Sequence, residues 1–257
     1  MSSKLFDLTG KVALITGGSR GLGREMALAF AEHGAHVAIA SRKLESCEKT
    51  AAEIRAYGVE ASAHACHVAH WNEVEKLAEA VLARFGRIDI LVNNAGLSPL
   101  YPSLDAITEE LFDKVIGINL KGPFRLSALV AKHMMENGGG SIINISSTAA
   151  VTPSPGSEPY CSAKAGINAL TRSMAYAYGP KVRVNCIMPG PFLTDISKAW
   201  DLAAFEAGAK QNIPLQRGGQ PHEIVGAALY LASNASSYTT GAILPVDGGS
   251  GGNPRIL

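Results

Sequence analysis

The sequence predicts an α/β fold in which helices cover both faces of one parallel sheet. Short apolar runs alternate with longer amphipathic stretches along the chain, and the connections between them are short. The apolar runs are continuous rather than alternating, which is typical of strands buried on both faces. Because no linker or low-complexity tract divides its 257 residues, we expect one doubly wound domain, residues 1–257.

The elements follow in order along the chain. Strands are expected at 12–16, 36–41, 60–66, 88–93, 141–146, 182–188 and 242–246. Helices are expected at 20–33, 44–57, 71–85, 108–137, 158–178 and 221–233. Gly34, Gly58 and Gly86 stand where the first three helices should end. Pro245 has no amide hydrogen to donate to a neighbouring strand, so the last strand should lie at an edge of the sheet.

One stretch, residues 191–216, fits neither pattern. It contains several large apolar side chains, among them Ile196, Trp200 and Phe205, between Gly190 and a Gly-Gly pair. Two short apolar helices that form a lid over a substrate pocket would explain the composition. A helical pair packed on the core would leave the same pattern, so the sequence keeps both interpretations open.

Composition excludes several classes of partner. The chain has 23 basic and 22 acidic residues and no basic stripe, so neither nucleic acid nor an anionic membrane surface is an expected partner. No run of 18 apolar residues is present, and the first ten residues do not resemble a signal peptide. The four cysteines form no CxxC pair, which favours reduced thiols and a cytoplasmic location. His64, Cys66, His67 and His70 lie close in sequence, but without a second ligand pair we expect no metal site.

A glycine-rich turn directly follows the first strand. It reads Thr16-Gly17-Gly18-Ser19-Arg20-Gly21-Leu22-Gly23 and opens the first helix. Glycines at this place let the backbone approach a pyrophosphate, which then lies at the helix N-terminus. The spacing differs from the common GxGxxG pattern, and no GK[ST] follows. By itself the motif could be only a tight turn.

Further motifs occur in a fixed order along the chain. Asn93-Asn94-Ala95-Gly96 ends the fourth strand, and Pro189-Gly190 ends the sixth, with Thr194 four residues later. Tyr160-Cys161-Ser162-Ala163-Lys164 opens a helix thirteen residues after Ser147, and Asn119 lies earlier in the chain. From Lys11 to Gly249 these motifs resemble the short-chain dehydrogenase/reductase family. The resemblance implies a Rossmann-type sheet of seven parallel strands, a nicotinamide cofactor and, commonly, a homotetramer.

Four residues form the expected catalytic group: Asn119, Ser147, Tyr160 and Lys164. Tyr160 and Lys164 are four residues apart and so share one helix face. A free tyrosine has a pKa near 10, but a nearby ammonium favours the phenolate, which makes Tyr160 a usable acid or base. Ser147 can donate a hydrogen bond to the substrate oxygen, and the spacing selects it over Ser146. The resemblance implies that Asn119 helps hold a water between Lys164 and solvent.

The end of the second strand indicates the cofactor. An NAD site would place an acidic residue here to bind the ribose hydroxyls, whereas this chain has Ser41-Arg42-Lys43. A hydroxyl and a guanidinium suit the 2′-phosphate of NADP(H), and Arg20 could supply a second cation. We therefore expect NADP(H) rather than NAD(H).

The resemblance also implies a wider set of cofactor contacts, with two departures from the usual pattern. His67-Val68 stands where the family usually has Asp-Val beside the adenine, so the bond to the adenine amino group is in doubt, and His67 could stack or donate instead. Phe192 stands where a smaller side chain is common, so the nicotinamide pocket should be tighter. The expected contacts are Gly17, Ser19, Arg20, Gly21, Leu22, Gly23, Ser41, Arg42, Lys43, His67, Val68, Asn93, Ala95, Gly96, Tyr160, Lys164, Pro189, Gly190, Phe192 and Thr194.

The expected function is reduction of a ketone, or oxidation of a secondary alcohol, on a small and largely apolar substrate. An alternative is a 3-oxoacyl thioester reductase that acts on an acyl carrier protein or CoA. It is less favoured because residues 136–140 offer no cation to an acidic carrier. A second alternative, a non-catalytic dinucleotide-binding scaffold or sensor, would be expected to lose Tyr160 or Lys164. The pocket should be lined by Leu97, Leu100, Tyr101, Val151, Pro153, Phe192 and the lid.

The last strand and the helix that opens at Tyr160 together predict a homotetramer. An apolar edge strand at 242–246 would be open in a monomer and invites pairing with a second subunit. Small side chains along the helix permit close packing across a two-fold axis, although they could equally pack on the sheet of their own subunit. These small residues are Ala163, Ala165, Ala169, Ala175 and Ala177.

Overall fold

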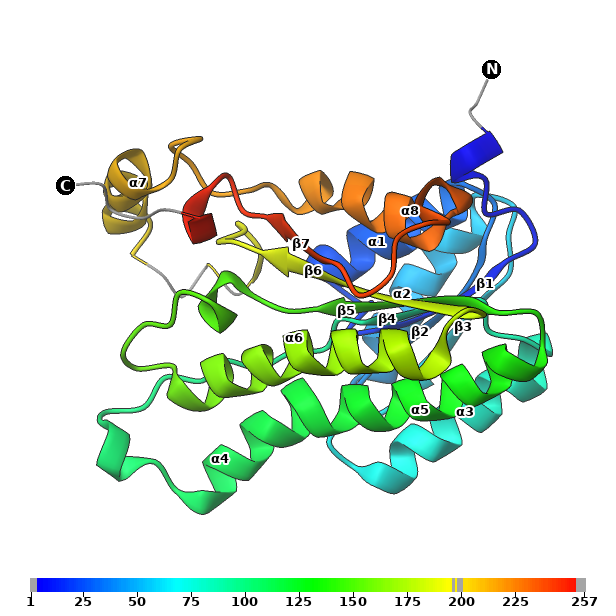
Figure 1. Ribbon diagram of the computed structural model, residues 1–257, viewed down its shortest axis with the longest axis horizontal. Coiled ribbons are helices and arrows are strands. Elements are labelled where there is room, and N and C mark those ends of the chain that lie inside the picture. Colours follow the sequence, from blue (N-terminus) through cyan, green and yellow to red (C-terminus); the bar gives the residue numbers. More distant parts are fainter. Residues whose placement is uncertain (1–3, 196, 198–200, 253–257) are drawn as a thin grey trace.

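A computed structural model describes residues 4–195, 197 and 201–252 of the chain. The strands lie in one parallel sheet of seven, in the order β3-β2-β1-β4-β5-β6-β7 (Figure 1). Strand order reverses between β1 and β4, and ligands of open α/β sheets bind at such a point. The strands are β1 Val12–Thr16, β2 His36–Ser41, β3 Ala61–Ala65, β4 Ile90–Asn93, β5 Gly140–Ile145, β6 Val182–Pro189 and β7 Ile243–Val246.

Helices cover both faces of the sheet (Figure 1). The residues of β1 alternate between two hydrophobic clusters: Ala13 and Ile15 pack with α1, α2 and α8, whereas Val12 and Leu14 pack with α3, α5 and α6. This arrangement confirms the predicted doubly wound sheet. The α-helices are α1 Gly21–Glu32, α2 Leu44–Arg55, α3 Trp71–Phe85, α4 Glu109–Ile116, α5 Gly122–Glu136, α6 Glu158–Tyr178, α7 Leu202–Asn212 and α8 Val225–Ala232.

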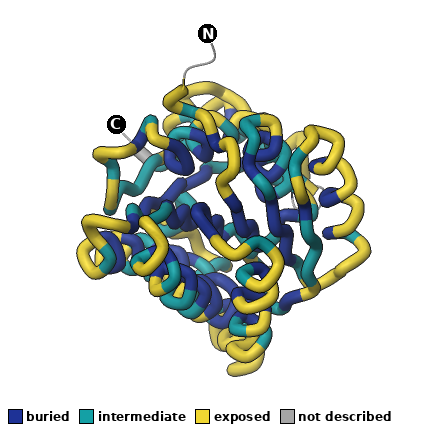
Figure 2. Tube along the Cα trace, turned by 90° about the vertical axis from the view of Figure 1, so that its right-hand side faces the viewer, coloured by how far each residue is buried: buried dark blue, intermediate teal, exposed yellow. Residues whose placement is uncertain are grey.

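Burial follows from this layering. Every residue of β1 is buried, and the central strands lie inside a shell of partly exposed helices and exposed loops (Figure 2). At the end of the sheet, β7 pairs with β6, and Pro245 is exposed there. The structure therefore confirms the edge position that this proline predicts. No helix among the described residues is both long and apolar enough to cross a membrane.

Two predicted helices are each divided in the structure. The stretch 108–137 contains α4, a π-helical turn at Gly117–Lys121 and then α5. A Cβ on Gly122 would lie only 2.2 Å from the carbonyl oxygen of Val68, so the chain approaches that loop too closely for any side chain. The stretch 221–233 likewise begins with a 3-10 helix, Pro221–Ile224, before α8.

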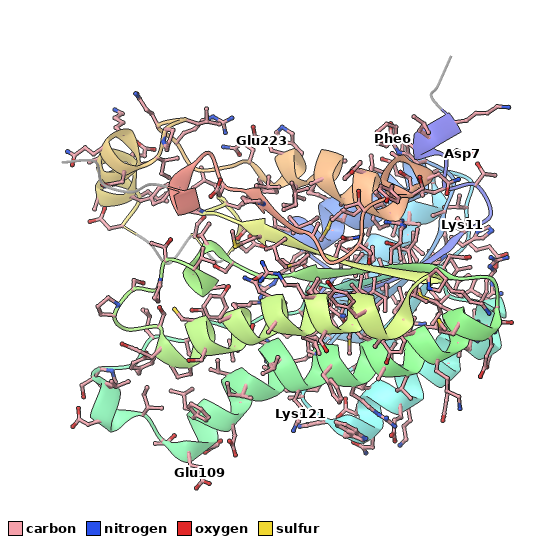
Figure 3. The ribbon with its side chains drawn as sticks, viewed as in Figure 1. Phe6, Asp7, Lys11, Glu109, Lys121 and Glu223 are labelled. Atoms are coloured by element: carbon pink, nitrogen blue, oxygen red, sulfur yellow. The ribbon has the colours of Figure 1, made fainter. Side chains whose placement is uncertain are left out.

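The expected lid, residues 191–216, contains α7, which lies beyond the carboxyl ends of β6 and β7 (Figure 1). The ring of Phe205 packs over Gly218, where a Cβ would lie 3.1 Å from it. Two short helices were predicted for this stretch, and two of its large apolar residues, Ile196 and Trp200, lie outside the described residues. At the end of the stretch, Arg217 makes a bidentate ion pair with Glu223, whose side chain Figure 3 labels near α8.

Candidate active site

The glycine-rich turn lies between β1 and α1 and is held against the end of β4. Gly17 has a φ of +65°, and a Cβ there would lie 2.8 Å from the side-chain nitrogen of Asn94. A Cβ on Gly23 would lie 2.4 Å from the carbonyl oxygen of Gly17. Only glycine fits at these two positions, because Gly17 combines a positive φ with close contacts to Asn94 and the backbone of Ala95, and Gly23 meets the backbone of Gly17.

Asn94 is the residue that ties β4 to this turn. Its side-chain amide donates to the carbonyl oxygens of Thr16 and Gly17, at 3.1 Å each. The sequence prediction named its neighbour Asn93 as a cofactor contact. The Asn93 side chain is buried and donates to Ser127 and Asn144, at 2.8 Å each, so any contact with a cofactor would come from its backbone and stays a prediction.

The start of α1 forms a cradle for an anion. Arg20, the N-cap residue, makes no side-chain cap, and α1 begins with Gly21 at a φ of +52°. A Cβ on Gly21 would lie 3.6 Å from Cβ of Thr194, so the predicted contact at Thr194 closes the other side of the turn. Backbone N–H groups at a helix N-terminus bind phosphate well, and these residues therefore fit the pyrophosphate of a dinucleotide.

The end of β2 lies beside the cradle. The Ser19 hydroxyl donates to the Ser41 hydroxyl at 3.2 Å, and the Ser41 hydroxyl lies 3.3 Å from the carbonyl oxygen of Lys43 and 3.0 Å from Sγ of Cys47. Arg42 and Lys43 are exposed. The structure thus brings the predicted hydroxyl and cations next to the glycine-rich turn.

His67 adjoins this region from the loop after β3. Its ring stacks on His70 with 4.4 Å between centroids, and its backbone N–H donates to Glu73 at 2.7 Å. Burial, with smaller contributions from the charges of His70 and Arg42, lowers the pKa of His67. Nδ1 of His67 is buried without a hydrogen-bond partner among the described residues. The same residues contain no group of three or more potential ligands that could hold a metal ion.

Ser147 and Tyr160 meet at the carboxyl end of β5. Ser147 caps the 3-10 helix η4, Thr148–Ala150, and its hydroxyl accepts from the Ala149 N–H at 3.2 Å. Burial raises the pKa of Tyr160, and a hydrogen bond with Ser147 partly offsets that effect. The adjacent Ser146 is 3% exposed and donates to the carbonyl oxygen of Lys164 at 3.1 Å, so it helps to pack α6 on β5.

Lys164 lies one helical turn after Tyr160 on the same face of α6. It is 4% exposed, and its Nζ donates to the carbonyl oxygen of Ile145 at 2.8 Å. Burial lowers the pKa of Lys164 from 10.5 to about 8. Its Nζ lies 5.6 Å from the centre of the Tyr160 ring, so a buried cation stands next to the tyrosine.

Asn119 is fully buried in the π-helical turn. Its amide nitrogen donates to the carbonyl oxygens of Leu97 and Val115, at 2.8 and 2.9 Å. Its side-chain oxygen accepts from the Leu97 N–H at 3.2 Å. A Cβ on Gly96 would lie 3.2 Å from the same oxygen. Asn119 therefore fixes the loop after β4 near Lys164, while its part in a water relay stays a prediction.

The residues predicted to line the substrate pocket differ in how far their side chains are exposed. Leu97 is half-buried, whereas Leu100 is 91% exposed and Val151 is 52% exposed. Phe192 is only 7% exposed and belongs to the core, with its ring 2.8 Å from where a Cβ of Gly219 would lie. The ring of Phe192 therefore packs in the core against Gly219, and its expected contact with the nicotinamide pocket stays a prediction.

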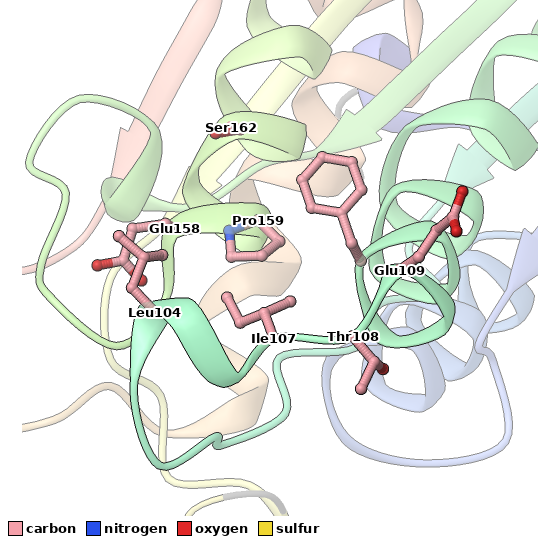
Figure 4. A pocket seen from close by; sticks show the side chains of 8 residues that line it. Leu104, Ile107, Thr108, Glu109, Glu158, Pro159 and Ser162 are labelled. Atoms are coloured by element: carbon pink, nitrogen blue, oxygen red, sulfur yellow. The ribbon is translucent and has the colours of Figure 1, made fainter.

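Tyr101 binds the first turn of α6 rather than standing free in a pocket. Its hydroxyl donates to the Glu158 carboxylate and accepts from the Glu158 N–H at 2.9 Å. Glu158 also borders a cavity between α4 and the start of α6 (Figure 4). The cavity touches Pro159 and Ser162, which the helical repeat turns away from Tyr160, so it is separate from the catalytic crevice. The cavity is lined by Leu104, Ile107, Thr108, Glu109, Phe112, Glu158, Pro159 and Ser162.

The doubly wound sheet, the glycine cradle and the tyrosine–lysine pair together define a dinucleotide-binding oxidoreductase of the Rossmann type. Comparison with known proteins agrees. Residues 17–251 match the family model described as Enoyl-(Acyl carrier protein) reductase. D-threitol dehydrogenase of Mycolicibacterium smegmatis is 41% identical over 249 residues, which cover 95% of this chain and 94% of that protein.

Two solved structures are similar over nearly the whole chain. The 7α-hydroxysteroid dehydrogenase complex with NADH and 7-oxo glycochenodeoxycholic acid has a TM-score of 0.92 and 38% identity, covering 97% of both chains. The NADPH-dependent 3-quinuclidinone reductase of Rhodotorula rubra has a TM-score of 0.90 and 36% identity, covering 96% of this chain and 93% of that chain. The chain belongs to the short-chain dehydrogenase/reductase family and is an oxidoreductase that acts on alcohols or ketones.

Proposed function

We propose that the protein interconverts a ketone and a secondary alcohol of a small, largely apolar substrate, with NADP(H) as its cofactor. The observation that carries the proposal is the meeting of Tyr160, Ser147 and buried Lys164 beside the glycine cradle. When bound, the nicotinamide supplies the hydride for reduction and accepts it in oxidation. The residues of the chain supply the proton and hold the substrate oxygen.

Tyr160 acts as the acid in reduction, and its hydroxyl donates a proton to the substrate oxygen. Ser147 lies beside the Tyr160 hydroxyl. When substrate is bound, the Ser147 hydroxyl donates to the substrate oxygen as negative charge develops on that oxygen. The Lys164 ammonium stabilises the phenolate that remains, because the two groups share one low-dielectric site. A positioned acid of this kind contributes about 10²–10⁴ to the rate.

The preference for NADP(H) is supported by the residues at the end of β2. The hydroxyls of Ser19 and Ser41 are linked, and the exposed Arg42 guanidinium adjoins them, which suits a 2′-phosphate. His67 lies in the loop after β3, and its buried Nδ1 has no hydrogen-bond partner among the described residues, so it is free to bind a group of the cofactor. One similar structure is named with NADPH and another with NADH, so these relatives do not decide between the cofactors. The proposed preference for NADP(H) therefore depends on Ser19, Ser41 and Arg42 of this chain.

A 3-oxoacyl thioester reductase is the second candidate. One observation favours it beyond the description of the family model: Lys181 lies at the end of α5, where its Nζ donates to the carbonyl oxygen of Met135 at 2.8 Å. The Lys181 ammonium thus lies beside residues 136–140, which have no cation of their own, although Lys181 is distant from them in sequence. A single lysine already bound to a carbonyl is a weak docking surface for an acidic carrier, so a small free substrate remains our first choice.

The test is a steady-state assay of NADPH and NADH oxidation against one panel of carbonyl compounds. The panel contains small apolar ketones, hydroxylated ketones and 3-oxoacyl thioesters. We expect turnover of at least one small ketone, with a higher kcat/KM for NADPH than for NADH. Turnover of the thioesters alone would favour the second candidate, and no turnover of any compound with either cofactor would contradict the proposal.

We further propose that the enzyme is a cytoplasmic homotetramer. The location is supported by four buried free cysteines. Assembly is supported by the edge strand β7 and by an apolar hollow between α6 and the segment where α4, the π-helical turn and α5 join. Ala165, Ala169 and Ala177 are exposed on α6, but Ala163 and Ala175 are buried within their own subunit and were wrongly expected at an interface. The hollow is lined by Ile116, Leu120, Lys121, Phe124, Gly166, Ala169, Leu170 and Ser173.

A further inference from the structure

The turn after β7, residues 247–251, is built around one carboxylate. Oδ1 of Asp247 accepts from the Gly249 N–H at 2.9 Å, and Oδ2 accepts from the Gly251 N–H at 2.7 Å. Gly248 and Gly249 have φ values of +63° and +91°, which favour glycine. The side chain of Asp247 therefore fixes the path of a segment that has almost no side chains of its own.

One end of this turn presses on the loop that carries Ser147. A Cβ on Gly251 would lie 3.0 Å from Cγ2 of Thr148 and 2.9 Å from Oδ2 of Asp247. Thr148 is the first residue of η4, the short helix that Ser147 caps. A shift of Gly251 would therefore move the residue that follows Ser147.

The middle of the turn supports the base of the lid. The Leu215 N–H donates to the carbonyl oxygen of Gly248 at 3.1 Å. A Cβ on Gly249 would lie 2.6 Å from the ring of Pro214. These contacts are tight and involve the residues that directly follow α7, so the place of the lid depends on the turn.

The start of the turn adjoins the loop after β6, where Gly190 is one of the expected cofactor contacts. The Gly190 N–H donates to the carbonyl oxygen of Val246 at 3.0 Å. A Cβ on Gly190 would lie 2.8 Å from Cα of Asp247. Three parts of the site that are distant in sequence thus contact one turn of five residues.

We infer that Asp247 is a positioning residue for the reaction, because its carboxylate holds the turn that places Ser147 and the base of the lid. This role rests on the proposed function, in which Ser147 binds the substrate oxygen. Asp247 acts through Thr148, Pro214 and Leu215. Small misplacements of this kind cost about 100-fold in rate when they reach the reacting groups.

The test is Asp247→Asn, which keeps the size of the side chain but replaces one accepting oxygen with an NH₂ group. The matched control is Asp7→Asn. Asp7 holds a similar turn, accepting from the Thr9 N–H at 2.9 Å, but Figure 3 labels it near the N-terminus, away from α7. We expect Asp247→Asn to lower kcat/KM for the ketone about 10- to 100-fold, while Asp7→Asn stays within about twofold of the parent.

A second readout separates positioning from general loss of structure. The Ser147 hydrogen bond lowers the pKa of Tyr160, so its weakening should move the rising limb of the pH profile for alcohol oxidation to higher pH. Amide hydrogen exchange should become faster at Ala149 and Leu215, whose N–H groups are bonded in these loops, but not in the central strands.

Gly251→Ala gives the same test without removing the carboxylate, and Gly226→Ala is its control, because a Cβ there meets nothing within 4 Å. Kinetics, pH profile and exchange like the parent's in both Asp247→Asn and Gly251→Ala would overturn the inference. If the parent reduces no carbonyl compound, the proposed function fails. The exchange rates at Ala149 and Leu215 then still decide whether Asp247 holds these loops.

Discussion

Replacement of Lys164 with methionine tests whether a desolvated cation stands beside Tyr160. Methionine keeps an unbranched side chain of similar length but removes the charge and the donor to the carbonyl oxygen of Ile145. Activity should fall at least about 100-fold, because the phenolate loses its stabilising ammonium. The substitution should also remove a rise in the free energy of unfolding between pH 7 and pH 10, which a buried lysine with a lowered pKa produces.

The magnitude follows from the pKa of Lys164, which burial lowers from 10.5 to about 8. Below pH 8 both the folded and unfolded chains hold the proton, and the folded protein bears the full cost of the buried charge, about 3 kcal/mol. Between pH 8 and 10.5 the folded chain has lost a proton that the unfolded chain still holds, so stability rises with pH. The gain amounts to about 2.5 kcal/mol between pH 7 and pH 10.

The assay is urea unfolding of parent and Lys164→Met without cofactor, at one protein concentration and at both pH values. The free energy of unfolding of the parent should rise by about 2.5 kcal/mol relative to the variant, since titrating groups away from Lys164 affect both proteins equally. Lys76→Met, which removes an exposed lysine, is the control and should follow the parent. Parallel pH dependence of parent and Lys164→Met would show that burial does not lower the pKa of Lys164 in the folded protein.

Three further predictions address the cofactor, the cradle and assembly. Arg42→Ala should weaken NADPH binding about 10- to 150-fold while leaving NADH within a few-fold, as measured by fluorescence titration; equal losses would assign Arg42 to the fold. Asn94→Ala removes two hydrogen bonds to the glycine-rich turn and should weaken both cofactors alike while costing about 1–3 kcal/mol of stability; unchanged binding would contradict its role. Light scattering at micromolar concentration should give the mass of four chains, and a fully active, monodisperse monomer would refute the tetramer.

The sheet and the cradle could be predicted because their signals are local. Apolar runs mark strands buried on both faces, and the positive φ of Gly17 and the contact between Gly23 and Gly17 arise within the turn that follows β1. The break between α4 and α5 could not be predicted from local sequence. It arises where Gly122 meets the backbone of Val68, which the chain reaches only in the folded protein.

In the site, the helical spacing correctly paired Tyr160 with Lys164, since both lie on one helix. The different contacts of the Asn93 and Asn94 side chains could not be predicted, because in a strand covered on both faces apolar periodicity does not reveal which side chain points into the core. The packing of Phe192 in the core could not be predicted because its partner, Gly219, is distant in sequence. Long-range contacts of this kind carry no local signal.

The most direct test of the account is the turnover of Tyr160→Phe with NADPH and the best ketone of the panel. The ring fills the same volume, so NADPH affinity, measured by fluorescence titration, should stay within a few-fold of the parent. The hydroxyl that donates the proton is gone, so kcat should fall about 10²- to 10⁴-fold. A variant that binds NADPH normally and keeps more than about a tenth of the parent's kcat would contradict the assignment of Tyr160 as the acid.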